Sequence, residues 1–392
     1  MRRKKLLILS SYGGYGHIAA ANTLTALLGD QYEIEVVYPI KDLRIMGIPS
    51  GESIYNFLLS NNLMRTNNFM VRYLAPPALR AREEKMARLI EKYIDEKKPD
   101  LLVSVVCYVN YPASEAAHRS GIPFLLVTVD YDMHNYMKSM DKMRCNDFKV
   151  TISGDLPSIR ESLLQHRISE ASIEPIGLPL RTGFLEAKNK DMLREKYEIP
   201  QGKRVVLVMF GGVGSKYTYR YAEAIAATSS NLHLVVCAGR NGKLAEKLQR
   251  IQPAAGNSID IVPFTEKIDE LFAVSDLLVT KPGPGTITEA MRCKLPILID
   301  RMSTPLFWEE ANIELVLSNK VGACIHTLDE IPELLNRYFY DEVTKRALAE
   351  AYQRVSENHF AEKIVPLIED MVSDPIGGEV AMTSRSFSPN SL

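Results

Sequence analysis

A histidine follows a glycine-rich turn near the start of the chain. Residues 10–24, SSYGGYGHIAAANTL, come directly after the apolar run LLIL, which is typical of a strand that turns on glycines into a helix. A turn that binds phosphate through its backbone needs no side chain there, yet His17 follows Gly14 and Gly16. An imidazole at this place could remove a proton from a substrate hydroxyl. A capping or packing histidine is the alternative.

An aspartate ends another apolar run. Asp130 closes the stretch PFLLVTVD, where its carboxylate could orient His17 or share its proton. The chain continues through Asp132 to His134, so the two aspartates also form a DxD pair, which binds a divalent metal in some enzymes. We favour the proton role, because the turns best suited to an anionic nucleotide lie in the other half of the chain.

Those turns centre on residues 279–299, VTKPGPGTITEAMRCKLPILI. The pattern predicts a strand, a turn with Gly283 and Gly285, a helix that begins near Thr286, and a further strand. Glycines allow a ligand to approach the backbone, and the N-terminus of a helix favours an anion such as diphosphate. Glu289, one turn into the helix, could accept hydrogen bonds from both hydroxyls of a ribose. Complementing the helix dipole is an equally good interpretation.

Two further features could serve the same ligand. The stretch FGGVGS, residues 210–215, is a second glycine turn behind an apolar run and contains Gly212 and Gly214. Arg181, in the segment PIGLPLRTGF, could reach a phosphate from the connection between the two halves. An arginine at such a place is also often solvated.

The elements that must position these residues are strands alternating with helices. Apolar runs separated by helical stretches are typical of buried parallel strands with crossover helices. The runs are KKLLILSS, IEVVYPI, DLLVSVV, PFLLVTV, FKVTIS, VVLVMF, LHLVVCA, IDIVPF, DLLVT and LPILID. A strand followed by glycines opens each of two series, as LLILSSYGGYGH and VVLVMFGGVGS. We therefore predict two doubly wound α/β domains that face each other, with a hinge near residues 180–200.

Composition limits the class of protein. A chain of 392 residues with 46% hydrophobic residues can bury the cores of two domains, and a formal charge of −1 gives no sign of a general nucleic-acid binder. Five dispersed cysteines without a CxxC motif predict reduced thiols and a cytosolic compartment. The apolar run after MRRKK is too short for a signal peptide or a membrane span.

One segment combines basic and large apolar residues. Residues 53–82 contain four arginines and no acidic residue, together with many apolar and aromatic side chains. Such a surface suits an anionic membrane interface, although an ordinary core helix with solvated arginines is the alternative. The candidate membrane contacts are Phe57, Leu58, Arg65, Phe69 and Arg72. Residues 374–392, by contrast, have few large apolar groups and are predicted to be disordered.

Several motifs together resemble a known family. They are TKPGPGTITEAM with LPI, CAGRNGKL at residues 237–244, FGGVGS, GLPLR at residues 177–181, and GYGH. Over about residues 4–372 the chain resembles the monogalactosyldiacylglycerol synthases and processive diacylglycerol glucosyltransferases of glycosyltransferase family 28. It resembles the peptidoglycan N-acetylglucosaminyltransferase more distantly. The resemblance implies the GT-B fold, in which two Rossmann-like, doubly wound parallel-sheet domains face an interdomain cleft.

The resemblance also implies a division of labour. Residues 1–185 would bind a lipid acceptor at the membrane, residues 200–354 would bind the donor, and a helix at 355–372 would pack back on the first domain. The enzyme would transfer a hexose from a UDP-sugar to diacylglycerol or a similar lipid with inversion. It would need no cofactor or essential metal and would bind no nucleic acid. It would lie in the cytoplasm, at the inner face of an anionic cell membrane.

Individual residues acquire roles by the same resemblance. The uracil would lie against the backbone near Ile268, the ribose on Glu289, and the diphosphate near Gly214, Thr286 and Arg181. The implied catalytic residues are His17 and Asp130, and the acceptor contacts are Gly14, Gly16 and His134. The implied donor contacts are Arg181, Gly212, Gly214, Arg240, Ile268, Gly283, Gly285, Thr286, Glu289, Glu309 and Asn312.

One position departs from the family pattern. A Gln-Glu-x-x-Asn string usually contacts the donor sugar, and the matching residues here are WEEAN, residues 308–312. Glu309 and Asn312 are kept, but Trp308 replaces an amide, which removes an acceptor and adds bulk beside the expected hexose. Trp308 could stack on the pyranose or simply pack, and the identity of the sugar stays open.

Three other functions fit parts of the sequence. One is a UDP-N-acetylglucosamine transferase to a polyprenyl-linked precursor, although TKPGPGTITEAM and CAGRN fit the lipid group better. Another is a dinucleotide-dependent oxidoreductase, because Gly14, Gly16 and Ala19 satisfy G-x-G-x-x-A, but the second strand ends in Tyr-Pro instead of an acid. The third is a non-catalytic or isomerase relative of the same fold, which Trp308 leaves open.

Overall fold

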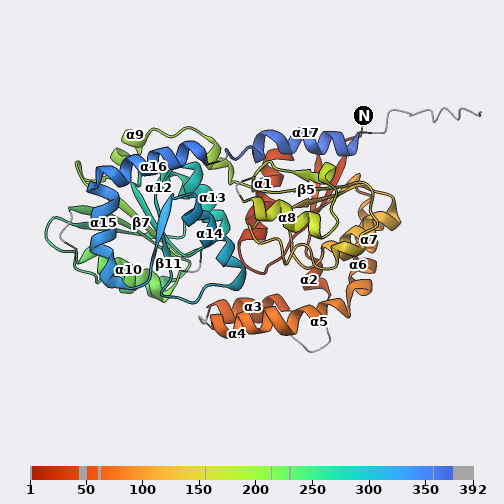
Figure 1. Cartoon of the computed structure of the whole chain (residues 1–392), viewed down its shortest axis with the longest axis horizontal. Coiled ribbons are helices and arrows are strands. Elements are labelled where there is room, and N and C mark those ends of the chain that lie inside the picture. The colour runs from red at the N-terminus through yellow and green to blue at the C-terminus, as the bar shows by residue number, and fades with distance from the viewer. Residues whose placement is uncertain are drawn as a thin grey trace, which may run out of the picture.

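Two lobes, each built on a parallel sheet, make up the protein (Figure 1). The computed structural model describes residues 2–43, 51–60, 63–154, 156–212, 214–228, 231–355 and 357–373. The tail predicted to be disordered, residues 374–392, lies outside these ranges. Each sheet has six strands, all in parallel register. The predicted fold class of two doubly wound α/β domains is confirmed.

The first lobe has the strand order β2-β1-β3-β4-β5-β6. Its strands are β1 (Lys5–Leu9), β2 (Glu33–Val37), β3 (Leu101–Ser104), β4 (Phe124–Val127), β5 (Phe148–Thr151) and β6 (Ile173–Glu174). Its helices are α1 (Gly16–Leu28), α2 (Pro39–Asp42), α3 (Gly51–Ser60), α4 (Met64–Phe69), α5 (Ala75–Arg80), α6 (Glu83–Lys97), α7 (Asn110–Ser120) and α8 (Pro157–Gln165). Strands β3 and β4 are buried along their whole length, as strands covered on both faces require.

The second lobe has the strand order β12-β11-β10-β7-β8-β9. Its strands are β7 (Arg204–Met209), β8 (Leu232–Gly239), β9 (Ser258–Pro263), β10 (Leu277–Thr280), β11 (Ile297–Asp300) and β12 (Gly322–Ile325). Its helices are α9 (Lys190–Lys196), α10 (Lys216–Ala226), α11 (Gly242–Leu248), α12 (Ile268–Val274), α13 (Pro284–Arg292), α14 (Glu310–Ser318), α15 (Ile331–Tyr340) and α16 (Glu342–Arg354). The apolar runs of the sequence therefore correspond to strands, except that β6 and β12 were not predicted.

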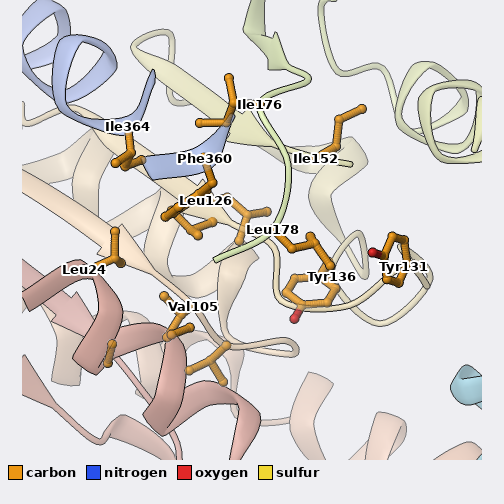
Figure 2. Close-up of a cluster of buried hydrophobic side chains, with 14 of the residues drawn as sticks. Leu24, Val105, Leu126, Tyr131, Tyr136, Ile152, Ile176, Leu178, Phe360 and Ile364 are labelled. Carbon is orange, nitrogen blue, oxygen red and sulfur yellow. The ribbon is translucent and has the colours of Figure 1, made fainter. Parts of the chain in front are cut away.

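The chain crosses between the lobes twice. Residues 175–189 lead from β6 to α9, which packs on α12 of the second lobe. After α16 the chain returns, and α17 (Phe360–Val372) lies along the first lobe (Figure 1). Phe360 and Ile364 are fully buried beside Leu126 and Leu178 of the first-lobe core (Figure 2). The final helix is thus anchored in the lobe where the chain begins.

Each sheet has a point where the strand order reverses. In the first lobe β1 lies between β2 and β3, and in the second lobe β7 lies between β8 and β10. The loops that follow β1 and β3 therefore diverge, as do those that follow β7 and β10. Ligands of doubly wound sheets bind at the carboxyl ends of the strands at this point. The glycine turns at residues 10–15 and 210–215 begin there.

Candidate active site

A cavity of about 1270 Å³ lies between the two lobes. It is lined by the loops that follow both reversal points. The lining segments at the strand ends lie within residues 11–18, 106–108, 129–136, 210–217, 281–284 and 303–309, and further lining comes from α3, α4 and α5. The structure thus brings the two predicted glycine turns to one site. No helix in the described ranges is long and apolar enough to span a bilayer.

His17 lines this cavity in the first turn of α1. Its Nδ1 atom lies 2.7 Å from the carbonyl oxygen of Val105, in the loop after β3. A carbonyl accepts only, so Nδ1 carries the proton and Nε2 keeps a lone pair. Burial lowers the pKa of His17, partly offset by the bond to Val105, so the ring is neutral near pH 7. Asp130 was expected to orient the imidazole of His17, but in the structure the backbone carbonyl of Val105 does so.

The glycine turn before His17 is held by α3. Glu52 accepts hydrogen bonds from the hydroxyl of Ser11 and from the backbone N–H of Tyr12, at 3.0 Å for the latter. Asn56 accepts from the N–H of Gly14 at 3.2 Å and donates to the carbonyl of Tyr12 at 2.8 Å. Gly14 has a φ of +83°, a backbone angle that residues with a side chain rarely adopt. Two of the N–H groups that could cradle a phosphate are therefore already used, and the turn acts to place the histidine.

Asp130 lines the cavity in the loop after β4. Burial raises the pKa of its carboxyl group to about 8, and the negative charge of Glu309 raises it further. The backbone N–H of Tyr131 and the side chain of Asn312 act in the opposite direction, because they stabilise the ionised form. Asn312 belongs to α14 of the second lobe. At neutral pH Asp130 therefore carries a proton, so it can donate a hydrogen bond but is a poor base.

The helix of the PGPGT turn begins earlier than predicted. Helix α13 starts at Pro284 with Gly283 as its N-cap, and not near Thr286, because proline fits the first helical position and its fixed φ favours it there. A Cβ atom at Gly285 would meet none of the described atoms within 4 Å, and one at Gly283 would meet only the side chain of Lys281. The fold itself therefore does not need glycine at these two positions. The absence of side chains there leaves open space over the N-terminus of the helix.

Gly214 differs, because its turn requires glycine. Its φ is +70°, and a Cβ atom there would lie 2.6 Å from the carbonyl oxygen of Ala238. Gly212 accepts at its carbonyl from the N–H of Arg240 at 2.9 Å, which joins the turn after β7 to the end of β8. The guanidinium of Arg240 lies 3.8 Å from the ring centroid of Phe264. The CAGRN motif thus supports the FGGVGS turn.

Arg181 and Glu289 bind each other. Two hydrogen bonds of 2.6 Å join the Nε and one terminal nitrogen of Arg181 to both carboxylate oxygens of Glu289. Burial raises the pKa of Glu289, and the guanidinium beside it opposes this shift. The two side chains expected to bind diphosphate and ribose separately form one bidentate pair between the interlobe connection and α13.

The structure places the predicted site residues in two groups. The cavity lining contains Gly14, Gly16, His17, Asp130, Gly212, Gly214 and Glu309. The lining does not include Arg181, Arg240, Ile268, Gly283, Gly285, Thr286, Glu289 and Asn312. His134 is not brought to the cavity: its side chain is exposed, and its N–H donates to Asp132 at 2.8 Å because the loop turns there. The acceptor contact of His134 stays a prediction.

Lys281 was not predicted and belongs to the site. It lines the cavity at the end of β10, and its Nζ lies 3.2 Å from a carboxylate oxygen of Glu309. The other oxygen of Glu309 accepts from the N–H of Leu306 at 3.0 Å, which fixes the buried carboxylate. The sequence does carry a signal for it, because TKPGPG places a lysine directly before a turn suited to diphosphate.

Trp308 lines the cavity next to Glu309. Its ring stacks on Tyr55 of α3 with centroids 6.2 Å apart, and Phe307 packs edge-on against it at 4.8 Å. The tryptophan that departs from the family pattern therefore packs against the first lobe while one part of it faces the site.

The candidate membrane segment exposes large side chains. Phe57 is 61% exposed and Phe69 56% exposed, and Arg65 and Arg72 are exposed too. Leu58 is only 7% exposed, so its predicted membrane contact is wrong: it lies on the inward face of α3. Other exposed apolar side chains of this part are Leu63, Tyr73 and Leu74. An exposed apolar and basic surface thus adjoins the cavity opening.

The arrangement of two facing lobes with a cavity at both reversal points is the GT-B class. MurG of Acinetobacter baumannii has a similar structure, with a TM-score of 0.63 and 16% identity over 94% of this chain and 100% of that one. UGT71G1 of Medicago truncatula, solved in complex with UDP-glucose, gives a TM-score of 0.57 and 14% identity, over 95% and 99% of the two chains. These likenesses concern the fold.

Sequence comparison points to one glycosyltransferase family. Residues 205–366 match the model of the glycosyltransferase family 28 C-terminal domain. A processive diacylglycerol beta-glucosyltransferase of Bacillus subtilis (strain 168) is 23% identical over 378 residues, 95% of both chains. A chloroplastic monogalactosyldiacylglycerol synthase of Spinacia oleracea is 26% identical over 358 residues, which are 86% of this chain and 66% of that protein. The chain is a distant relative of both.

Proposed function

We propose that the protein transfers a hexose from a UDP-sugar to diacylglycerol or a similar membrane lipid, with inversion at the anomeric carbon. The observation that carries this proposal is the state of His17. Its proton is held on Nδ1 by Val105, its pKa is lowered by burial, and the ring lines a cavity whose far wall is the donor lobe. A neutral imidazole in that position can act as a base on an acceptor hydroxyl.

In the proposed step one bond to the anomeric carbon forms while another breaks. Nε2 of His17 takes the proton of the acceptor hydroxyl while its oxygen bonds to the anomeric carbon, and the bond from that carbon to the diphosphate oxygen breaks. UDP leaves as an anion, toward Lys281 and the N-terminus of α13. These groups supply positive charge and N–H donors, so the proposed transfer needs no metal or other cofactor.

Asp130 has a second role in this proposal. Because it is protonated at neutral pH, it can donate a hydrogen bond to a substrate and does not compete with His17 as base. The side chain of Asn312, in the opposite lobe, acts against the raised pKa of Asp130. Glu309 and Trp308 on the donor side would face the hexose.

The acceptor class follows from the surface beside the cavity and from the relatives. Exposed Phe57 and Phe69 with Arg65 and Arg72 suit a bilayer with anionic lipids, where both apolar burial and positive charge contribute. Two relatives are named a processive diacylglycerol beta-glucosyltransferase and a monogalactosyldiacylglycerol synthase. We therefore propose a peripheral protein at the cytoplasmic face of the cell membrane.

The test is a transfer assay with vesicles that contain diacylglycerol and a panel of UDP-hexoses. The expected product is a glycosyldiacylglycerol whose anomeric configuration is inverted relative to the donor, detected by mass spectrometry and NMR. Replacing diacylglycerol with a polyprenyl-linked acceptor tests the alternative substrate. Transfer to the polyprenyl acceptor alone, or no transfer from any UDP-hexose, would overturn the proposal.

A further inference from the structure

A loop of the donor lobe is attached to a helix of the acceptor lobe. The loop is residues 303–309, which carries Trp308 and Glu309, and the helix is α4. The side-chain amide of Asn68 donates to the carbonyl of Pro305 at 2.8 Å, and its oxygen accepts from the N–H of Phe307 at 3.1 Å. Both hydrogen-bonding groups of one side chain are thus used on the backbone of the opposite lobe.

Aromatic contacts extend this attachment. Tyr55 of α3 stacks on Trp308, and the guanidinium of Arg72 lies 5.8 Å from the ring centroid of Phe307. The attachment therefore involves successive parts of one first-lobe segment, residues 51–60 and 63–74, which we call the bridging segment. Its helices α3 and α4 extend beneath the first lobe toward the second (Figure 1).

The bridging segment also holds the turn that places His17. Glu52 and Asn56 lie one helical turn apart on α3, and between them they bind the hydroxyl of Ser11 and the backbone of Tyr12 and Gly14. One segment thus contacts the loop on each side of the cavity. The same segment exposes Phe57, Phe69 and Tyr73.

We infer that Asn68 is a positioning residue, which fixes the loop 303–309 so that Trp308 and Glu309 face His17 across the cavity. Because Asn68 lies on α4 next to Phe69 of the surface proposed to meet the membrane, binding to lipid would stabilise this loop as well. The role of Asn68 in fixing the loop stands on the contacts above, and its coupling to lipid rests on the proposed function. Backbone hydrogen bonds made by a single side chain are specific to its shape, so few substitutions would replace them.

The test compares the variants Asn68→Ala and Asn68→Asp with the wild type. Alanine removes both bonds, whereas aspartate keeps the oxygen that accepts from Phe307 and loses the donor to Pro305. Asn319→Ala is the matched control, because its amide donates only to the carbonyl of Leu315 near its own helix. Since Asn68→Asp has the shape of the native residue, it remains informative if the alanine variant does not fold.

The first measurement is amide hydrogen exchange of residues 303–309, which requires no turnover. We expect the Phe307 amide to exchange about tenfold faster in Asn68→Ala, to be less affected in Asn68→Asp, and to be unchanged in Asn319→Ala. Vesicles of phosphatidylglycerol with dioleoylglycerol should slow this exchange in the wild type and not in Asn68→Ala. Equal exchange in Asn68→Ala and the control would overturn the inference.

The second measurement is kinetic. With the glycosyl acceptor in vesicles, Asn68→Ala should lower kcat/KM for the UDP-sugar by about tenfold, while His17 keeps its pH dependence. A changed pH limb would contradict a role in positioning the donor-side loop. If the wild type forms no glycolipid, the proposed function fails, but the exchange of the loop in buffer still decides the role of Asn68.

Discussion

The Nδ1 atom of His17 lies 2.7 Å from the carbonyl oxygen of Val105. Val105 follows β3, and His17 follows the turn after β1, so the bond joins the two loops that diverge at the first reversal point. The bond fixes both the orientation of the ring and the tautomer, which leaves Nε2 as the only basic nitrogen. The imidazole ring of His17 is therefore oriented by a backbone group that no side-chain substitution removes.

Replacing His17 with alanine should abolish most of the transfer. General base catalysis typically contributes a factor of about 10² to 10⁴, so kcat should fall within that range. The KM for the UDP-sugar should change little, because His17 lies on the first lobe, opposite the lobe proposed to bind the donor. The measurement is steady-state transfer to diacylglycerol vesicles, and His118→Ala, an exposed histidine at the end of α7, is the control. Equal losses in both variants would speak against a catalytic imidazole.

The pH profile should report the same group. Burial lowers the pKa of His17 below its ordinary 6.5. The neutral ring is the active form, so kcat/KM should be constant near neutral pH and should fall as the pH decreases through this lowered pKa. An acid limb below pH 6.5, measured with a donor and an acceptor that do not titrate there, is the expected result. A limb above 6.5 would mean that the ring is stabilised as a cation.

Asp130 should make stability depend on pH. Its pKa is about 8 in the fold against 3.8 as a free side chain. The folded state therefore binds this proton more tightly, and the free energy of unfolding should decrease as the pH rises from about 4 to about 8, by at most about 1.4 kcal/mol per pH unit. The Asp130→Asn variant should lose this pH dependence, so it should be more stable than the wild type at the upper end of this pH range.

Urea unfolding at several pH values measures the effect of Asp130. Asp141→Asn, at an exposed aspartate, is the matched control and should leave the pH dependence as it is in the wild type. If the difference between the Asp130→Asn variant and the wild type does not grow with pH, Asp130 is ionised in the folded protein.

The sequence predicts the backbone of this structure better than it predicts the contacts of the side chains. The Leu- and Val-rich runs determined the parallel strands, since a strand covered on both faces must be apolar throughout. The short β12, GACI, has no such run and was missed. Two glycine turns a domain apart were enough to predict facing lobes, because doubly wound sheets bind ligands at the reversal point.

The partners of the site residues could not be predicted in the same way. That His17 would bind Val105, and that Arg181 would bind Glu289, depends on how loops distant in sequence meet after folding. The bond between Asn68 and the loop at 305–307 links residues more than 200 positions apart. No local pattern marks Asn68, which is one of several polar residues in a predominantly apolar and basic segment.

Membrane binding should depend on exposed aromatic residues of the bridging segment. Phe69 is 56% exposed and lies 5.4 Å, centroid to centroid, from Tyr73. Moving such a side chain into the bilayer interface contributes about 1 kcal/mol or more, so Phe69→Ser should weaken binding to anionic vesicles roughly three- to tenfold. Vesicle sedimentation measures this. Tyr340→Ser, which changes an exposed aromatic on α15 of the other lobe, should bind as the wild type does.

The Arg181–Glu289 pair should connect the hinge to the donor helix energetically. Removing either charge leaves the other without its partner, and Glu289 is only 4% exposed, so Arg181→Gln and Glu289→Gln should each lower the free energy of unfolding by about 1.5–3 kcal/mol. The double variant should lose less than the sum, because the two changes remove one interaction. Urea unfolding of the four proteins gives this coupling energy.

A surface pair supplies the control for this cycle. Arg301 and Glu310 lie 2.8 Å apart, but the glutamate side chain is 54% exposed, so solvent screens the pair and its coupling should be below about 1 kcal/mol. UDP titrated into the same variants adds a second readout. Because the family resemblance assigns Glu289 to the ribose and Arg181 to the diphosphate, each single variant should weaken UDP binding, whereas the Arg301 variant should not. If the double variant of each pair loses as much stability as the sum of its two single variants, the hinge and α13 are held together by other contacts.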